Sequence, residues 1–152
     1  RRLDAFGFLA PNIENRNVLG CIWASSVFPG HAPHGLISFR SLLGGVRHPE
    51  RSEGTDEELF ARARVELDAL CGMQPDARPV EQRVVRWPRG IPQYDLDHAG
   101  AVEAADEAER MLPGLFISGN GYRGVALLDC LAGAEALAER VLARLPVQGA
   151  RA

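Results

Sequence analysis

Apolar and polar positions alternate in blocks through the first part of the chain, and these blocks predict a small antiparallel sheet. Residues 3–11 (LDAFGFLAP) predict a strand or loop that leads into a turn, and residues 18–27 and 36–43 predict two apolar, β-rich strands. The asparagine-rich stretch 12–17 predicts a turn, and the proline- and glycine-rich stretch 29–35 predicts a loop. The two strands are therefore expected to form an antiparallel pair with a long hairpin connection.

Residues 55–71 show the clearest helical periodicity, with one apolar stripe. Thr55 as N-cap with Glu58 three residues later predicts a capping box, and Gly72 supplies the stop. Glu58 and Arg62 stand four residues apart and predict an ion pair. The helix carries no motif for chemistry, so we expect it to be scaffold.

The remaining half of the chain predicts two further strands and two further helices. Residues 80–87 and 115–118 predict strands, and the alanine- and glutamate-rich stretch 97–112 predicts a helix. A second helical pattern starts at about residue 123 and runs to 145, and residues 147–152 (VQGARA) are expected to be a loose tail.

The chain is organised around LFISGNGYRGVALLDC, residues 115–130, where a predicted strand meets a helix through a glycine-rich turn. Gly119, Gly121 and Gly124 would let bare backbone N–H groups approach a flat or anionic ligand. The spacing matches G-x-G-x-x-G only in outline, and Glu139, the nearest candidate for a ribose-binding acid, lies inside the same helix. The residues alone thus leave two interpretations: a ligand-binding turn, or an ordinary connection with steric glycines.

Composition narrows the class of protein. The 152 residues suit one domain and are 46% apolar, and the net charge is −3 from 17 basic and 20 acidic residues. All the basic residues are arginines scattered along the chain, which argues against a nucleic-acid surface. No apolar run reaches the length of a membrane-spanning helix.

Cysteines and histidines do not predict a metal site. The three cysteines are odd in number and lack C-x-x-C spacing, as expected of reduced, buried thiols in a cytoplasmic protein. His31 and His34 lie in a proline- and glycine-rich loop without a nearby carboxylate or cysteine, and we interpret them as exposed loop residues.

Three ordered stretches resemble a known family. LFISGNGYRGVALLDC resembles the last flavin-contacting motif of oxygen-dependent protoporphyrinogen oxidases, FAD flavoenzymes of the haem pathway in the flavin amine oxidase superfamily. WPRGIPQY, residues 87–94, and FGFLAP, residues 6–11, agree with that family in order and spacing. Ser118, Gly90 and Leu128 depart mildly from the family's usual residues, which leaves the shape of the pocket open.

The resemblance implies a fold class of α+β / α/β, as a C-terminal fragment of a two-domain FAD-linked oxidoreductase. Residues 1–86 would be a portion of the substrate-binding domain. Residues 87–152 would return into the FAD-binding domain, with the strand–turn–helix 115–145 contacting the flavin. The dinucleotide-binding part of such an enzyme is expected upstream of this chain.

The resemblance also assigns site residues. The cofactor-binding residues would be an aromatic wall and a set of turn and backbone contacts: Trp87, Gly119, Asn120, Gly124, Val125 and Ala126. The substrate-binding residues would be those matching the family's mainly apolar slot: Gly7, Leu9, Ile22 and Leu42. Without the resemblance, Trp87 is a core or interface anchor, and Ile22 and Leu42 are plain sheet core. No catalytic acid, base or nucleophile is predicted, and Asp129 is expected to form hydrogen bonds or to be solvated.

The implied reaction is the six-electron oxidation of protoporphyrinogen IX to protoporphyrin IX at FAD, with O2 reduced to H2O2. Association with the inner face of the cell membrane would come from segments outside this chain, and the oligomeric state is left open. The alternatives are oxidation of coproporphyrinogen III, another flavin amine oxidase or desaturase, and a non-catalytic module. Exposed apolar surface is expected wherever missing parts of such an enzyme would pack.

Overall fold

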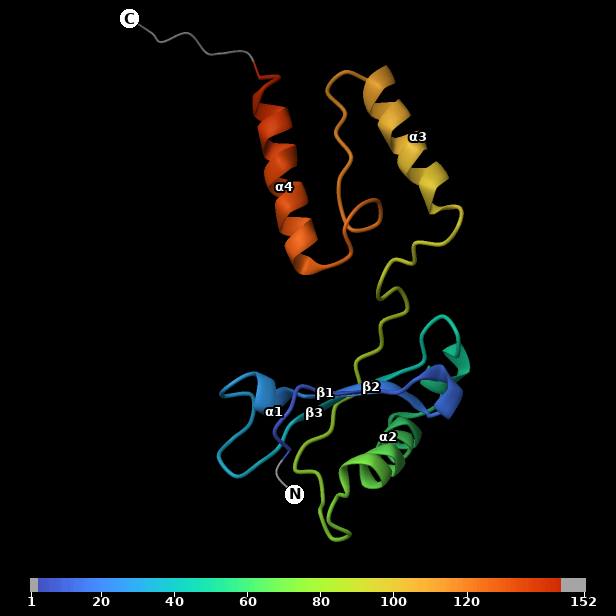
Figure 1. The fold of residues 1–152 in the computed structure, drawn as a ribbon, viewed down its shortest axis with the longest axis vertical. Coiled ribbons are helices and arrows are strands. Elements are labelled where there is room, and N and C mark those ends of the chain that lie inside the picture. The colour runs from blue at the N-terminus through green and yellow to red at the C-terminus, as the bar shows by residue number, and fades with distance from the viewer. Residues whose placement is uncertain (1–2, 146–152) are drawn as a thin grey trace, which may run out of the picture. The chain divides into compact units, whose positions relative to one another are not determined.

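The chain divides into two compact units, Arg1–Arg86 and Trp87–Ala152. The computed structural model describes residues 3–145 and is drawn in Figure 1. The first unit holds a sheet and one long helix, so it is an α+β unit, whereas the regular structure of the second unit is helical. The predicted tail 147–152 lies outside the described residues.

A three-stranded antiparallel sheet in the order β1-β2-β3 forms the first unit. Its strands are β1 (Gly7–Leu9), β2 (Val18–Trp23) and β3 (Phe39–Leu43). The predicted antiparallel pair with a long hairpin connection is confirmed as β2 and β3, and β1 adds a third strand on the other side of β2.

Both predicted strands of this pair are shorter than expected. The stretch 18–27 leaves the sheet after Trp23 and forms the one-turn helix α1 (Ala24–Val27), and the stretch 36–43 joins the sheet only at Phe39. The Ser25 hydroxyl explains part of this difference, because it accepts the Ser38 N–H at 3.0 Å. A serine side chain that bonds the backbone in this way competes with a strand ladder.

Two glycines face the backbone of the neighbouring strand where β1 and β2 pair. Gly7 pairs with Ile22, and Leu9 pairs with Gly20. A Cβ at Gly7 would lie 2.0 Å from the Cys21 carbonyl oxygen, and one at Gly20 would lie 2.5 Å from the Phe8 carbonyl oxygen. These positions therefore accept glycine because of the neighbouring backbone.

Helix α2 (Asp56–Cys71) packs against the sheet, as Figure 1 shows. The buried core between them is small and consists of apolar side chains from β2, α1 and α2: Val18, Cys21, Ala24, Leu59 and Cys71. The predicted capping box of Thr55 and Glu58 is confirmed, and so is the stop at Gly72, which has a φ of 63°.

The predicted ion pair between Glu58 and Arg62 does not form. The Glu58 carboxylate instead accepts the Thr55 N–H at 2.8 Å as part of the capping box. Arg62 donates to the carbonyl oxygens of Arg51 and Glu53 at 3.0 and 2.8 Å. The capping box therefore occupies the Glu58 carboxylate, and the loop before α2 occupies the Arg62 guanidinium.

Short 3-10 turns occupy the connections between β1 and β2 and between β3 and α2. The predicted turn 12–17 contains η1 (Asn12–Glu14), whose C-cap residue, Asn15, has a φ of 48°. The second turn, η2 (Pro49–Ser52), precedes α2.

The second unit contains α3 (His98–Met111) and α4 (Leu127–Leu142), joined across their sides by Glu109 and Arg140. The predicted helix 97–112 is confirmed as α3. The predicted helix 123–145 is shorter, because Gly124 has a φ of 71° and Ala126 is extended, so the helix starts only at Leu127.

The predicted strands 80–87 and 115–118 are wrong in this structure, since neither stretch is a strand. Within residues 3–145 no other strand pairs with them. Their groups bond elsewhere: Arg86 reaches Asp56 and the Gly54 carbonyl oxygen, and the Ile117 N–H reaches Glu109. An apolar run becomes a strand only where a neighbouring strand completes its ladder.

Candidate functional site

The face of the sheet in the first unit carries an apolar pocket of about 240 Å³. It is lined by residues from all three strands and from the residue before β1: Phe6, Gly7, Phe8, Leu9, Cys21, Ile22 and Leu42. The structure therefore brings all four sequence-predicted substrate residues together in one place. They meet because β1 and β3 flank β2 and the pairings set Gly7 opposite Ile22 and Leu42 opposite Gly20.

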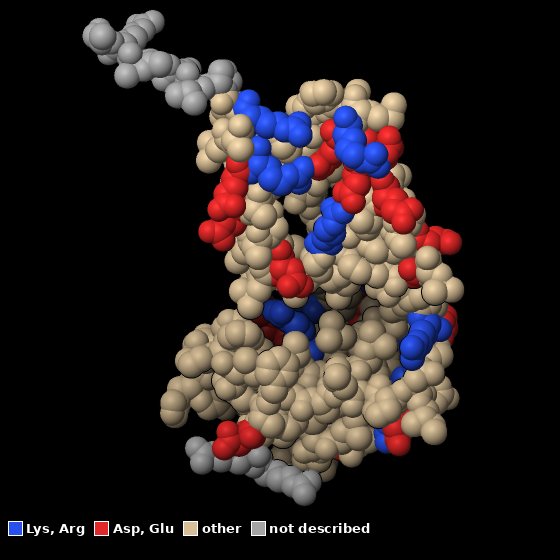
Figure 2. Space-filling model, turned by 45° about the horizontal axis from the view of Figure 1, so that its top comes forward, with Lys and Arg blue, Asp and Glu red and all other residues tan. Residues whose placement is uncertain are grey.

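This pocket is open to one side. Leu9 is 83% exposed and Leu42 is 45% exposed, so Leu42 is not a core residue of the sheet. The surface of this unit also includes a broad area with few charged side chains (Figure 2). A volume of 240 Å³ is below the range of roughly 300–1,000 Å³ typical of sites that enclose a drug-sized ligand. The pocket can therefore form one apolar wall of a larger site.

The glycine-rich turn of the second unit is exposed and uncrowded. Gly119 has a φ of 125°, and a Cβ built at Gly119 or Gly121 would meet nothing within 4 Å. Gly119 and Asn120 are exposed, whereas Gly124 and Val125 are half-buried. The backbone of the turn is thus accessible to a ligand.

Backbone donors collect where this turn enters α4. The N–H groups of Gly124 and Val125 have no acceptor among the described residues. The Ala126 N–H donates to the Asp129 carboxylate at 3.3 Å, and the Cys130 thiol lies 3.5 Å from the Gly124 carbonyl oxygen. Asp129 therefore forms a hydrogen bond at the start of the helix, one of the two roles expected for it. The donors that remain suit an anionic or carbonyl-bearing ligand edge.

A stacked tyrosine and histidine hold this turn in place. The Tyr94 hydroxyl donates to the Asn120 carbonyl oxygen at 2.8 Å, and His98 Nε2 lies 2.9 Å from the Tyr122 carbonyl oxygen. The two rings stack at 3.8 Å with an interplanar angle of 8°. Neither residue is among those predicted for the site. The sequence holds no signal for this stacking, because a four-residue spacing brings side chains together within a helix, whereas Tyr94 precedes α3 and His98 is its first residue.

The Trp87 side chain is 75% exposed at the start of the second unit. A Cβ added at Gly90 would lie 3.6 Å from the Trp87 Cβ. The role of Trp87 as an aromatic wall stays a prediction.

Comparison with known proteins gives one consistent result. A tobacco chloroplastic protoporphyrinogen oxidase is 34% identical over 142 residues, covering 91% of this chain and 26% of the relative. A spinach chloroplastic protoporphyrinogen oxidase 1 is 34% identical over 143 residues, covering 92% of this chain and 25% of the relative. This chain is a protoporphyrinogen oxidase-like segment.

A bacterial relative extends the comparison. A Staphylococcus aureus coproporphyrinogen III oxidase is 27% identical over 143 residues, covering 93% of this chain and 30% of the relative. The protoporphyrinogen oxidase-like segment therefore spans about a quarter to three tenths of the length of these relatives. No family model matches it.

The protoporphyrinogen oxidase-like segment also has an open cleft of about 820 Å³, lined mostly by charged residues near the C-terminal ends of α3 and α4. Arginines border it (Figure 2), and two of them, Arg140 and Arg144, lie over the Phe116 ring at 5.5 and 5.3 Å from its centroid. The Ile117 N–H donates to Glu109 at 2.6 Å, and this hydrogen bond, together with Arg140, lowers the pKa of the Glu109 carboxyl. We interpret these contacts of Glu109, Phe116 and Arg140 as the interactions that hold the stretch 115–118 against α3 and α4.

The cysteines and the loop histidines of the protoporphyrinogen oxidase-like segment differ in burial. Cys21 and Cys71 are buried free thiols whose pKa values are raised by burial, and Cys130 is a half-buried free thiol. His31 and His34 are exposed. Within residues 3–145 no group of three or more potential metal ligands comes together, and no helix there combines the length and apolarity needed to cross a membrane.

Proposed function

We propose that the protein carrying this chain is an FAD-dependent oxidase that converts protoporphyrinogen IX to protoporphyrin IX with O2 as acceptor. The observation that carries this proposal is the similarity to protoporphyrinogen oxidases along 91% of the chain at 34% identity. In this reaction the tetrapyrrole loses six electrons and six protons, and three O2 take them up as three H2O2. The product enters haem and porphyrin biosynthesis.

In this proposal the first unit is a portion of the substrate-binding domain. The porphyrinogen would lie against the pocket of Gly7, Leu9, Ile22 and Leu42, where apolar side chains match the apolar face of a tetrapyrrole. The two glycines of the β1–β2 hairpin keep this wall free of side chains at Gly7 and Gly20.

The second unit would belong to the FAD-binding domain. FAD supplies the two-electron chemistry that carries electrons from the porphyrinogen to O2. The exposed turn fits such a cofactor, because Cβ space is open at Gly119 and Gly121 and the N–H groups of Gly124 and Val125 lack acceptors within the described part of the chain.

Each candidate cofactor residue has a distinct part in this proposal. Gly119 and Asn120 would shape the turn, the N–H groups of Gly124 and Val125 would bind the polar edge of the flavin, and Trp87 would be the neighbouring aromatic wall. Ala126 would contribute through its remaining atoms, since its N–H bonds Asp129. Helix-terminal amides favour nearby negative charge by about 0.3–1 kcal/mol.

Coproporphyrinogen III is the second candidate substrate. Relatives named coproporphyrinogen III oxidase occur in Staphylococcus aureus at 27% identity and in Bacillus subtilis at 24%. The two substrates differ in the vinyl and propionate groups at the tetrapyrrole edge. The described pocket is apolar, which favours the less carboxylated protoporphyrinogen.

Porphyrin fluorescence tests the proposal. The complete FAD-loaded protein is incubated with protoporphyrinogen IX or coproporphyrinogen III under air, and product formation is compared with autoxidation and with O2 consumption. We expect the protoporphyrinogen to turn over with the higher kcat/KM. Turnover of neither porphyrinogen, or turnover of an amine instead, would contradict the proposal. We further propose a cytoplasmic protein that meets the membrane surface, testable by fractionation.

Two leucines of equal exposure give a matched pair of variants. Leu42 lines the pocket and is 45% exposed, whereas Leu36 lies outside the pocket and is 44% exposed. We expect Leu42→Asn to raise the KM for the porphyrinogen about fivefold or more, since a polar group would face the apolar substrate. Leu36→Asn should leave KM unchanged. Equal effects of both variants would argue against this pocket as the substrate wall.

A further inference from the structure

We infer that Glu66 is a positioning residue that fixes the β1–β2 hairpin and thereby the wall that the substrate meets. This inference rests on the proposed function and adds a residue of α2 that does not itself line the pocket. Glu66 is the one buried charged residue among the described part of the chain, at 4% exposure. A buried carboxylate requires compensating partners.

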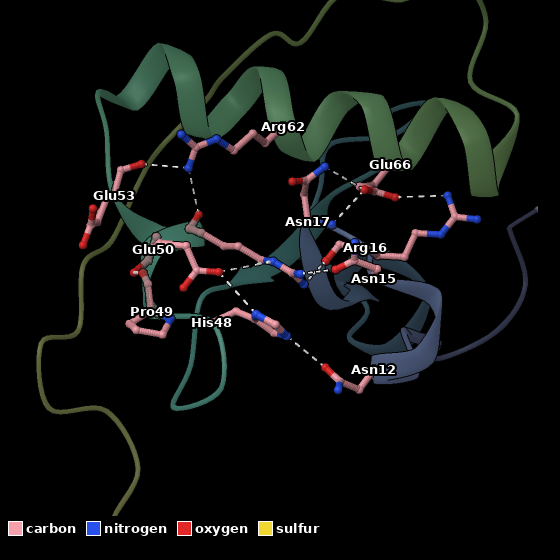
Figure 3. Close-up of polar contacts among 12 residues, drawn as sticks. Asn12, Asn15, Arg16, Asn17, His48, Pro49, Glu50, Glu53, Arg62 and Glu66 are labelled. Carbon is pink, nitrogen blue, oxygen red and sulfur yellow. Dashed lines mark hydrogen bonds and ion pairs between the residues drawn. The ribbon is translucent and has the colours of Figure 1, made fainter.

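All partners of Glu66 come from the connection between β1 and β2 (Figure 3). One carboxylate oxygen accepts the Asn17 backbone N–H at 2.9 Å and the Asn17 side-chain amide at 3.1 Å. The other oxygen accepts from the Arg16 guanidinium at 3.4 Å. A helix that packs on the sheet thus holds, by charge, the residue directly before β2.

The hairpin needs such an anchor because its own sequence specifies the register weakly. Strand β1 has only three residues, one of which is Gly7, and its partner strand β2 contains Gly20. In addition, the pairing of β2 with β3 shifts between Val18 and Gly20, so an extra residue is accommodated just after Asn17. Short, glycine-containing strands are prone to slip, and a slip of one residue turns every side chain to the other face.

Such a slip would dismantle the pocket. Leu9 and Ile22 would leave the open face of the sheet, and Leu42 would lose its place opposite Gly20. Glu66 does not line the pocket and bonds only the connection among the described residues, so it affects the pocket through the position of the strand.

Two further side chains support the same connection (Figure 3). Arg51 of η2 donates to the Arg16 carbonyl oxygen and, at 2.6 Å, to the Asn15 side chain. His48 lies 3.0 Å from the Asn12 side-chain oxygen. These bonds hold the outer part of the connection, whereas Glu66 is the group that bonds the backbone next to β2.

Steady-state kinetics of the complete FAD-loaded enzyme with protoporphyrinogen IX tests the inference. Glu66→Ala should raise KM about tenfold with kcat changed less than about twofold, because substrate binding and not electron transfer depends on the wall. Glu66→Gln keeps an oxygen acceptor for Asn17 and should restore most of the loss. Asp68→Asn is the matched control, since it removes a carboxylate of the same helix whose one side-chain partner among residues 3–145 is Arg64.

Amide hydrogen exchange supplies a second measurement. The Asn17 N–H should be protected in the parent and in Glu66→Gln, and should exchange rapidly in Glu66→Ala. If Glu66→Ala does not fold, Glu66→Asp, which withdraws the carboxylate by one methylene, carries the same test.

The outcomes separate the two proposals. A parent enzyme without porphyrinogen turnover overturns the proposed function and this inference with it. An active parent whose Glu66→Ala variant exchanges Asn17 rapidly but keeps its KM overturns this inference alone. Equal losses of kcat, flavin content and thermal stability in Glu66→Ala would also overturn it, since they mark a general loss of structure.

Discussion

Replacing Gly20 by alanine should separate β1 from β2. The added Cβ would lie 2.5 Å from the Phe8 carbonyl oxygen and 3.2 Å from the Leu9 Cα, both of them backbone atoms that cannot rotate away. Relief to ordinary contact requires the strands to move apart by roughly 1 Å, which lengthens the neighbouring ladder hydrogen bonds beyond their effective range.

The magnitude follows from the bonds affected. Two ladder hydrogen bonds at about 0.5–1.5 kcal/mol each, with some loss of packing in a small core, predict a cost of about 2–4 kcal/mol. Gly35→Ala is the matched control. Gly35 has a φ of 82° and nothing within 4 Å of an added Cβ, so its alanine variant is expected to cost only the backbone strain, about 1–2 kcal/mol.

Urea unfolding followed by tryptophan fluorescence measures both costs. The chain has two tryptophans, so a Trp87→Phe background leaves Trp23 of β2 as a local probe. At an m-value of about 1–3 kcal/mol/M, a cost of about 2–4 kcal/mol should lower the urea midpoint of Gly20→Ala by about 0.7–4 M. The reasoning would be refuted if Gly20→Ala cost less than Gly35→Ala, because the close approach would then carry no penalty.

Three other predictions concern single side chains. Thr55→Ala should destabilise the first unit by about 1 kcal/mol through loss of the capping box, measured by thermal melting. Cys130 should react first with iodoacetamide, while the buried Cys21, whose pKa is raised, should react only on unfolding. Folding lowers the pKa of the Glu109 carboxyl below its ordinary value of 4.5. The folding stability that this carboxylate contributes is therefore present above pH 4.5 and is lost as the pH falls through the lower pKa of the folded state. Glu109→Gln should flatten this acid dependence in a series of thermal melts at different pH values.

Features set by neighbours in sequence could be predicted. The capping box at Thr55, the stop at Gly72 and the helix over 97–112 depend mainly on local sequence, and all three are confirmed. The start of α4 was misplaced because Gly124 adopts a positive φ, a conformation that glycine permits but does not require.

Features set by distant partners could not be predicted. The apolar run 115–118 resembles a strand, yet the Ile117 N–H bonds Glu109 on another element. The Arg62 guanidinium likewise donates to two loop carbonyl oxygens and not to Glu58, the partner that the four-residue spacing predicted. The resemblance, in contrast, identified four residues from three strands that line one pocket, because it carried spatial information that the pattern of a single sequence lacks.

The bond between His98 and the Tyr122 carbonyl oxygen fixes the tautomer of the histidine ring. A carbonyl oxygen can only accept, so His98 must carry its proton on Nε2 for this bond to exist. Nδ1 is then the acceptor nitrogen of the neutral ring. Tyr94 and His98 therefore each donate one hydrogen bond to a carbonyl oxygen of the glycine-rich turn, so the stacked pair clamps the turn at Asn120 and at Tyr122.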